Sequence, residues 1–142
     1  VSLTTDIIVG FPGETDEDFN ETLNVIENGK FDSVYMFKFS ARPGTNAALF
    51  KEDYVDKDTI DTRFMKLKNL QTEISKKRYQ RFIGTDQYLL VEKYSKKSEN
   101  FMSGKIDGGQ TTHINANDVK IGDFIKVRIV EATPFALKAI IL

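Results

Sequence analysis

The chain has 142 residues, of which 40% are hydrophobic and 29% are charged, a composition that is ordinary for a globular protein. The formal net charge of -1 excludes a strong overall attraction to nucleic acid, and no apolar run approaches the roughly 20 residues that a membrane helix needs. The chain has no cysteine, which excludes disulfides, thiolate catalysis and cysteine-ligated metals within these residues and fits a cytoplasmic protein.

The first part of the chain predicts a strand–helix–strand unit. Leu3–Val9 is short and rich in β-branched residues, so we expect a buried strand there. A helix with a capping box should begin after Thr15 and end near Gly29. Val34–Phe39 is a second, aromatic-rich strand, and the helical crossover between the two strands predicts that they run parallel.

Residues 40–56 are predicted to be a loop, and Lys57 to about Phe82 a long helix with apolar residues at every third or fourth position. We interpret the basic residues from Arg63 to Arg81 as mostly a solvated face of that helix. Two parallel strands and two helices make a poor core by themselves. Residues 1–82 are therefore expected to be the end of a larger α/β barrel, in a chain that is a fragment of a longer protein.

The pattern changes after Gly84 to short alternating strands separated by turn signals, one of which is Ser98-Glu99-Asn100. The five expected strands are Gln87–Tyr94, Phe101–Ile106, Thr111–Asn115, Phe124–Ala132 and Ala136–Ile141. Five strands in so short a segment predict a small antiparallel β-barrel. The predicted fold is therefore α/β plus all-β, with domains at residues 1–82 and 83–142.

The turn after the first strand is a candidate ligand site, because α/β barrels bind ligands at the carboxyl ends of their strands. Gly10 and Gly13 either let the backbone approach a ligand closely or simply make the turn. Asp6 is an acid in an apolar strand, and it has either a structural hydrogen bond or a role in a cofactor site. Arg42 offers a planar fork for a carboxylate or phosphate, or forms a surface salt bridge.

Three segments together carry a family resemblance: TTDIIVGFPGET at residues 4–15, Phe31-Asp32-Ser33, and FKFSARPGT at residues 37–45. They closely resemble the late barrel strands of the radical S-adenosylmethionine tRNA methylthiotransferase family, MiaB type. The resemblance continues through the long helix into a terminal TRAM domain, with an OB-like five-stranded barrel. It implies that the parent enzyme uses one 4Fe-4S cluster to cleave S-adenosylmethionine into a radical. A second cluster would deliver sulfur, and a second S-adenosylmethionine the methyl group.

Carried onto this sequence, the resemblance places the turn after the first strand and the loop at residues 42–45 near the S-adenosylmethionine pocket. The cofactor-binding residues that it implies are Asp6, Gly10, Gly13, Glu14 and Arg42. The cysteines that would ligate the two clusters are absent from these residues. We therefore expect no catalytic residue and no metal ligand here, and no activity from this fragment alone.

The barrel segment interleaves basic with aromatic residues, a pattern found where small barrels bind nucleic acid. The alternative is a solvated charged face over an aromatic core. The TRAM resemblance favours RNA, and the predicted RNA-binding residues are Lys93, Lys96, Lys97, Lys105, His113, Lys126 and Arg128. His113 is the only histidine and is otherwise an ordinary exposed barrel residue.

The resemblance thus predicts the C-terminal part of a tRNA-2-methylthio-N(6)-isopentenyladenosine synthase, which methylthiolates the adenosine next to the anticodon. The barrel would bind the tRNA anticodon stem-loop, and the protein would act as a monomer away from membranes. Two alternatives stay open. One is a methylthiotransferase of the same class that modifies a ribosomal protein, and the other is an RNA-binding adaptor without catalysis.

Overall fold

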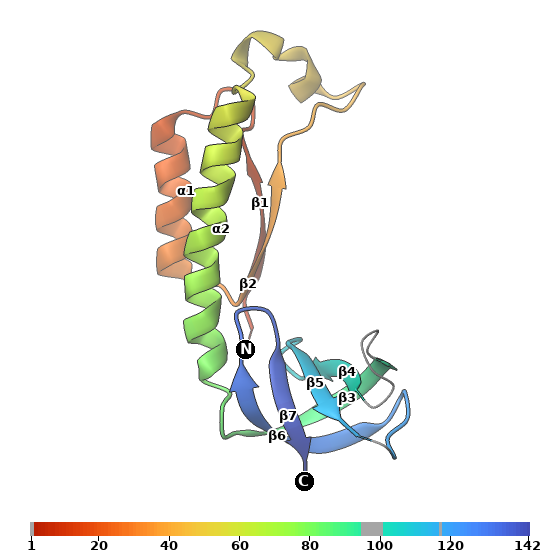
Figure 1. Cartoon of the computed structure of the whole chain (residues 1–142). Helices are drawn as coiled ribbons and strands as arrows, with labels where there is room; N and C mark the ends of the chain where they lie inside the picture. The colour runs from red at the N-terminus through yellow and green to blue at the C-terminus, as the bar shows by residue number, and fades with distance from the viewer. Residues whose placement is uncertain (1, 95–100, 117) are drawn as a thin grey trace. The chain divides into compact units, whose positions relative to one another are not determined.

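The computed structural model describes residues 2–94, 101–116 and 118–142 (Figure 1). Contacts divide the chain into an N-terminal unit, Leu3–Ile74, and a C-terminal unit that contains Ser2 and residues 75–142. Among the described residues, no helix combines the length and apolar character that a membrane crossing demands. The predicted turn at residues 98–100 lies outside the described residues.

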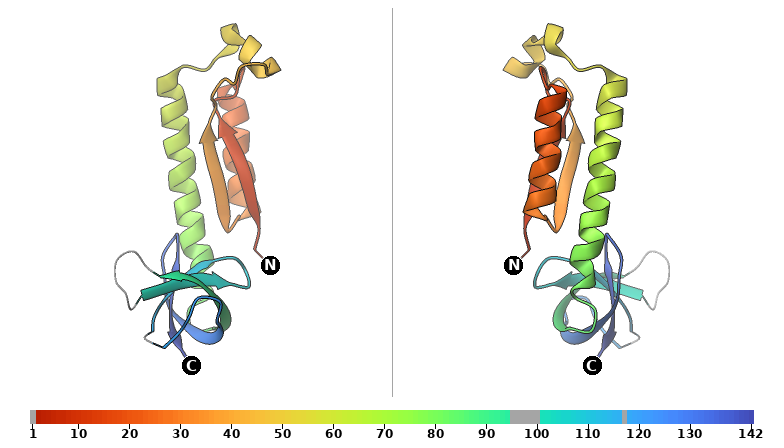
Figure 2. Two further views of the ribbon diagram at one scale, coloured as in Figure 1. Left: turned by 90° about the vertical axis from the view of Figure 1, so that its right-hand side faces the viewer. Right: turned by 90° about the vertical axis from the view of Figure 1, so that its left-hand side faces the viewer.

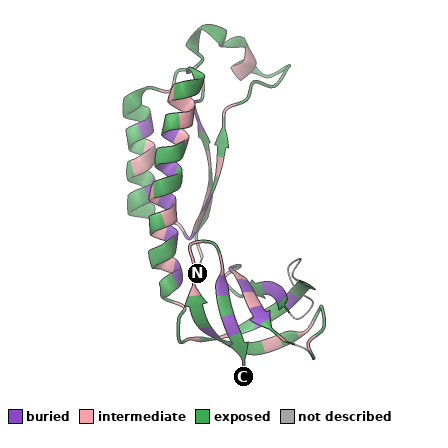
Figure 3. Cartoon of the chain, in the orientation of Figure 1, coloured by how far each residue is buried: buried purple, intermediate pink, exposed green. Residues whose placement is uncertain are grey.

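The N-terminal unit is a two-stranded parallel sheet covered on one face by two helices, α1 (Asp16–Gly29) and α2 (Lys57–Gln80) (Figures 1 and 2). Strand β1 (Thr4–Val9) pairs in register with β2 (Ser33–Lys38), which confirms the predicted parallel pair. The buried faces of the helices turn toward the strands (Figure 3). The buried core residues of this unit are Val9, Phe19, Ile26, Val34 and Leu67.

The predicted capping box at the start of α1 is confirmed. The Thr15 hydroxyl accepts a hydrogen bond from the Asp18 backbone N–H at 3.1 Å, and the Asp18 carboxylate accepts one from the Thr15 N–H at 2.9 Å. The hydrogen bond from the Thr15 backbone lowers the pKa of Asp18. At the other end, the left-handed residue is Lys30, with φ of 48°, one position after the expected Gly29.

The segment between β2 and α2 is not the plain loop that the sequence predicts. It contains two short 3-10 helices, η1 (Asn46–Leu49) and η2 (Lys51–Asp53). The Tyr54 hydroxyl donates to the Ala48 carbonyl at 3.1 Å, and the Asp53 carbonyl accepts from Gly13 N–H at 2.8 Å. These local bonds satisfy backbone groups that a connecting segment would otherwise leave to water.

The C-terminal unit is a closed barrel with the strand order β3-β4-β5-β7-β6. Its strands are β3 (Asp86–Tyr94), β4 (Phe101–Ile106), β5 (Thr111–Asn115), β6 (Phe124–Ala132) and β7 (Leu137–Ile141). Alternate side chains of every strand fill the interior, and Tyr79 at the end of α2 joins this core. Residues Leu89, Val91, Val127, Ile129 and Leu137 are almost completely buried.

The barrel is not antiparallel throughout, which corrects the expectation from the sequence. Strands β5 and β7 run parallel, whereas the other four neighbouring pairs run antiparallel. A closed ring of five strands cannot alternate direction at every step, because five is odd. At least one neighbouring pair must therefore run parallel. In this barrel it is β5 and β7, which are adjacent although β6 lies between them in the sequence.

Candidate nucleic-acid interface and strand-end site

The turn after β1 depends on glycine at position 10. Gly10 has φ of +76°, and a Cβ there would lie 2.3 Å from Ile60 Cγ1. Gly13 has φ of +82° with open space around it, and its N–H donates to Asp53. Within the described structure, these two predicted cofactor residues therefore build a tight turn against α2.

Glu14, another predicted cofactor residue, points into the protein. Its carboxylate accepts a hydrogen bond from Gly10 N–H and pairs with the Arg63 guanidinium at 3.1 Å. Arg63 also donates to the Glu14 carbonyl at 3.0 Å and to Asp16 at 2.8 Å. The Glu14 and Arg63 side chains are only 10% and 7% exposed. Burial acts to lower the pKa of Arg63, but the hydrogen bond with Asp16 and the charge of Glu14 outweigh it and raise that pKa.

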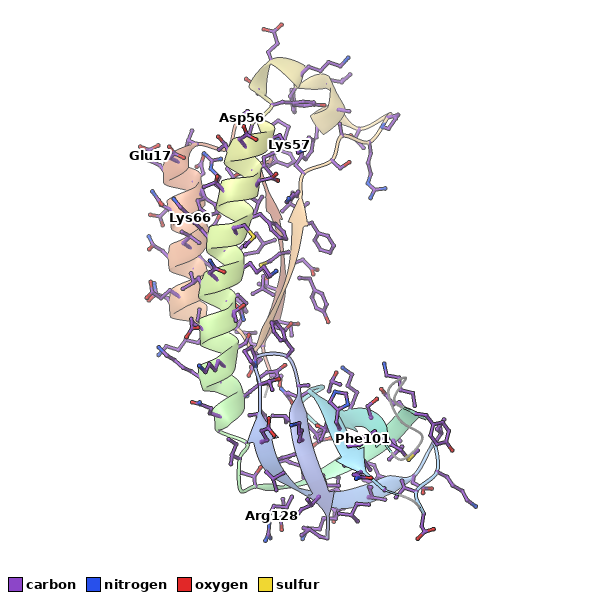
Figure 4. All side chains as sticks on the ribbon, in the orientation of Figure 1. Glu17, Asp56, Lys57, Lys66, Phe101 and Arg128 are labelled. Atoms are coloured by element: carbon purple, nitrogen blue, oxygen red, sulfur yellow. The ribbon has the colours of Figure 1, made fainter. Side chains whose placement is uncertain are left out.

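Arg63 is an exception to the mostly solvated face that the basic stretch predicts. Its side chain is buried and joins α2 to the turn after β1, whereas Lys66, one turn along the helix, is exposed (Figure 4). The position of Arg63 along the helix could have identified it, from the sequence, as a residue of the buried face. It lies three residues after Ile60 and four before Leu67, and hence on the apolar stripe of the helix.

Asp6 and Arg42 are both exposed, so Asp6 is not the buried acid that the apolar strand suggests. Thr4, Asp6 and Ile8 alternate on the uncovered face of β1, and the neighbouring positions on β2 are Tyr35 and Phe37. The Asp6 carboxylate makes no hydrogen bond with another described residue. Arg42 borders a hollow of about 330 Å³ at the carboxyl ends of the strands, whose other lining residues include Ile8, Phe11, Phe37 and Phe39.

On the barrel, two of the predicted RNA-binding residues converge on one acid. Arg128 Nε donates to Asp86 at 2.7 Å, and Lys126 Nζ lies 3.4 Å from the other carboxylate oxygen. All three side chains are on the outside of the barrel, where Figure 4 labels Arg128. The hydrogen bond from Arg128 lowers the pKa of Asp86, and the same bond raises the pKa of Arg128. Asp86 therefore neutralises part of the positive charge of this surface.

Beside this cluster, Tyr88 of β3 and Phe124 of β6 stack with their ring centroids 5.2 Å apart and their planes 9° from parallel. Both residues are exposed, Tyr88 by 54% and Phe124 by 65%. We call the outer surface of these two strands the β3–β6 face. It consists of Asp86, Tyr88, Leu90, Phe124, Lys126 and Arg128, which are paired across the two strands.

The remaining predicted RNA-binding residues are distributed over other strands. Lys105 of β4 is paired with Leu90 and so borders the β3–β6 face. Lys93 and His113 are both paired with Ser103, and His113 is also paired with Lys138, in a row across β3, β4, β5 and β7. Of the five predicted residues that the structure describes, only Lys126 and Arg128 therefore lie on the β3–β6 face. Lys96 and Lys97 lie outside the described residues.

The described residues contain no group of three or more histidine, cysteine or acidic side chains arranged to hold a metal ion. The chemistry that the barrel surface supports is that of a polyanion interface. Lysine and arginine attract phosphates without regard to sequence, and exposed rings stack on bases.

Comparison with protein families matches residues 80–142 to the TRAM domain. The matched segment begins at the last residue of α2 and contains all five strands of the barrel.

Comparison with curated proteins extends the similarity to nearly the whole chain. A tRNA-2-methylthio-N(6)-dimethylallyladenosine synthase of Clostridium botulinum is 42% identical over 137 residues, which are 96% of this chain and 30% of the relative. The protein of the same name from Corynebacterium diphtheriae is 43% identical over 147 aligned positions, 97% of this chain and 28% of the relative. The chain thus spans less than a third of these relatives' length. The matches confirm the resemblance that the three sequence segments indicated.

Proposed function

We propose that this chain, which carries a TRAM domain and is similar along almost its whole length to tRNA methylthiotransferases, is the C-terminal part of such an enzyme. The parent would methylthiolate N(6)-isopentenyladenosine next to the anticodon, and the barrel would bind the tRNA. The observation that carries the RNA-binding role is the β3–β6 face, where exposed rings adjoin lysine and arginine. A surface of that kind suits a phosphate backbone with accessible bases.

We further propose that the strand-end site of the N-terminal unit forms one wall of the S-adenosylmethionine pocket in the parent. The donor set fits this cofactor, because the Arg42 guanidinium can pair with a carboxylate and the hollow beside it is lined by aromatic and aliphatic side chains. Gly10, Gly13 and Glu14 would hold the turn in place, and Asp6 would face the barrel interior from the uncovered side of β1. When bound, S-adenosylmethionine supplies the radical and the methyl group.

The RNA-binding role predicts that the 142-residue chain binds an anticodon stem-loop RNA with an affinity that falls as salt rises. If Lys105, Lys126 and Arg128 contact three phosphates, raising the salt from about 50 to about 200 mM should weaken binding roughly 20-fold. Fluorescence anisotropy of a labelled stem-loop measures this slope directly. Affinity that does not change with salt, or no binding even at low salt, contradicts the proposal.

A substitution of Asp86 tests the RNA-binding role more specifically. Asp86→Asn removes the acid that pairs with Lys126 and Arg128, so both cations can contact phosphate without first giving up an ion pair. Binding should tighten several-fold, and the slope of log affinity against log salt should steepen by up to about 1. Asp107→Asn is the matched control, because it makes the same change in net charge at a turn outside the β3–β6 face. Equal effects of the two substitutions would show that only net charge matters.

A further inference from the structure

The stacked pair on the β3–β6 face lies outside the core of the barrel. The barrel interior is filled by a separate set of side chains, and neither Tyr88 nor Phe124 belongs to it. Each of the two residues is more than half exposed to solvent, an arrangement that hydrophobic burial alone does not favour. The rings stack nearly parallel, so each covers part of one face of the other and keeps its outer face for a further ring.

Charge around the pair indicates what kind of ring this surface suits. Lys126 lies directly across from Tyr88, and Lys105 lies across from Leu90, which is itself paired with Phe124. A lysine thus borders the aromatic pair on the side of β6 and another on the side of β4. A nucleotide combines an aromatic base with a phosphate one sugar away, and this combination complements rings bordered by lysines.

The exposed ring faces should distinguish RNA with unpaired bases from duplex RNA. In a duplex, each base is covered on both faces by its neighbours, and only backbone and groove edges meet a protein surface. An unpaired base in a loop can turn out of its stack and expose a face. An exposed aromatic pair can therefore stack on an unpaired base but not on a base within a duplex.

We infer that Tyr88 and Phe124 form a stacking platform for an unpaired nucleobase, with Lys105 and Lys126 contacting the phosphates on either side of it. The inference rests on the proposed RNA-binding role and adds that the barrel recognises a loop through a base, beyond its contacts to the backbone. Base–aromatic stacking contributes about 1–3 kcal/mol per base, which corresponds to roughly 5- to 150-fold in affinity.

The test compares two RNA probes on the 142-residue chain: a hairpin with 2-aminopurine in its unpaired loop, and a fully paired duplex of the same length. The chain has no tryptophan, so the fluorescence of 2-aminopurine reports its stacking without interference. Phe124→Leu should weaken hairpin binding at least 5-fold and abolish the fluorescence change on binding. Duplex affinity should stay the same.

Two further variants control for folding and for general surface effects. Phe124→Tyr keeps an aromatic ring and should retain hairpin binding. Phe135→Leu removes an exposed ring from the turn between β6 and β7, outside the β3–β6 face, and should change neither affinity. Circular dichroism of each variant verifies that it is folded.

The outcomes separate this inference from the role on which it rests. If Phe124→Leu binds the hairpin as tightly as the unchanged chain, while binding remains salt-dependent, the platform is refuted and the RNA-binding role stands. Equal losses for the hairpin and the duplex also refute it, because a duplex offers no free base face. If the unchanged chain binds neither probe at low salt, both the inference and the RNA-binding role fail.

Discussion

Gly104→Ala should destabilise the barrel by about 3 kcal/mol or more, because the added methyl group would meet backbone that cannot rotate away. A Cβ at position 104 would lie 1.8 Å from the Leu90 carbonyl oxygen and 3.0 Å from Val91 Cα. Gly104 pairs with Val91 next to the point where the register of β3 shifts, so β3 and β4 approach each other closely there. Accommodating the methyl group requires the two strands to separate and lose ladder hydrogen bonds.

Amide hydrogen exchange of β4 and β6, followed by NMR at increasing urea, measures this loss for the barrel itself. Asn115→Ala is the control, because Asn115 is an exposed residue on the neighbouring strand β5, and it should change stability by no more than about 0.5 kcal/mol. A Gly104→Ala barrel with the same protection as the Asn115→Ala barrel would mean that the close approach of β3 and β4 is not as described.

Arg63→Met should destabilise the N-terminal unit by about 2–3 kcal/mol, because it leaves the Glu14 carboxylate buried without its cation. Removing one member of a deeply buried pair costs about 3–5 kcal/mol, and the value here is smaller because the Asp16 end of the network opens to solvent. The unfolding transition monitored by circular dichroism at the helix band gives the change, since α1 and most of α2 belong to this unit.

A double substitution distinguishes the lost pair from simple lost packing. Arg63→Met combined with Glu14→Gln removes the stranded charge, so the double variant should be more stable than the sum of the single losses predicts. Lys66→Met, on the exposed face of the same helix, should have an effect of no more than about 0.5 kcal/mol. Strictly additive losses would mean that Arg63 and Glu14 do not interact.

Much of the fold could be predicted because local sequence patterns determine it. Strands β4, β5 and β6 have the bounds that alternation and turn residues predict, and α2 begins at the predicted Lys57. The parallel β1–β2 pair follows from its helical crossover. Turn chemistry and hydrophobic period are properties of neighbouring residues, and that explains why they can be identified in a single sequence.

The differences arise from contacts between residues far apart in the sequence. The Arg63–Glu14 pair joins positions 49 residues apart, and a charge count along the helix cannot reveal it. Asp86 meets Arg128 across the β3–β6 ladder, 42 residues away, so its neutralising role depends on a register that the sequence does not specify. The parallel β5–β7 pair likewise follows from barrel closure.

The β3–β6 face, too, could be predicted from the sequence only in part. The outward positions of Tyr88 and Phe124 could be inferred from their alternation with buried Leu89 and half-buried Ile125. Their stacking could not, because it requires β3 and β6 to be neighbours. The roles proposed for Asp6, Gly10, Gly13, Glu14 and Arg42 in cofactor binding stay predictions, as do those of the basic barrel residues in RNA binding.

The central claim, that the parent of this chain is a tRNA methylthiotransferase, is tested most directly by nucleoside analysis of tRNA from cells in which its gene is disrupted. We expect the 2-methylthio derivative of N(6)-isopentenyladenosine to disappear and the unmodified N(6)-isopentenyladenosine to accumulate, and a plasmid copy of the gene to reverse both changes. An unchanged level of the 2-methylthio nucleoside would contradict the claim and favour a ribosomal-protein substrate or a non-catalytic RNA-binding role.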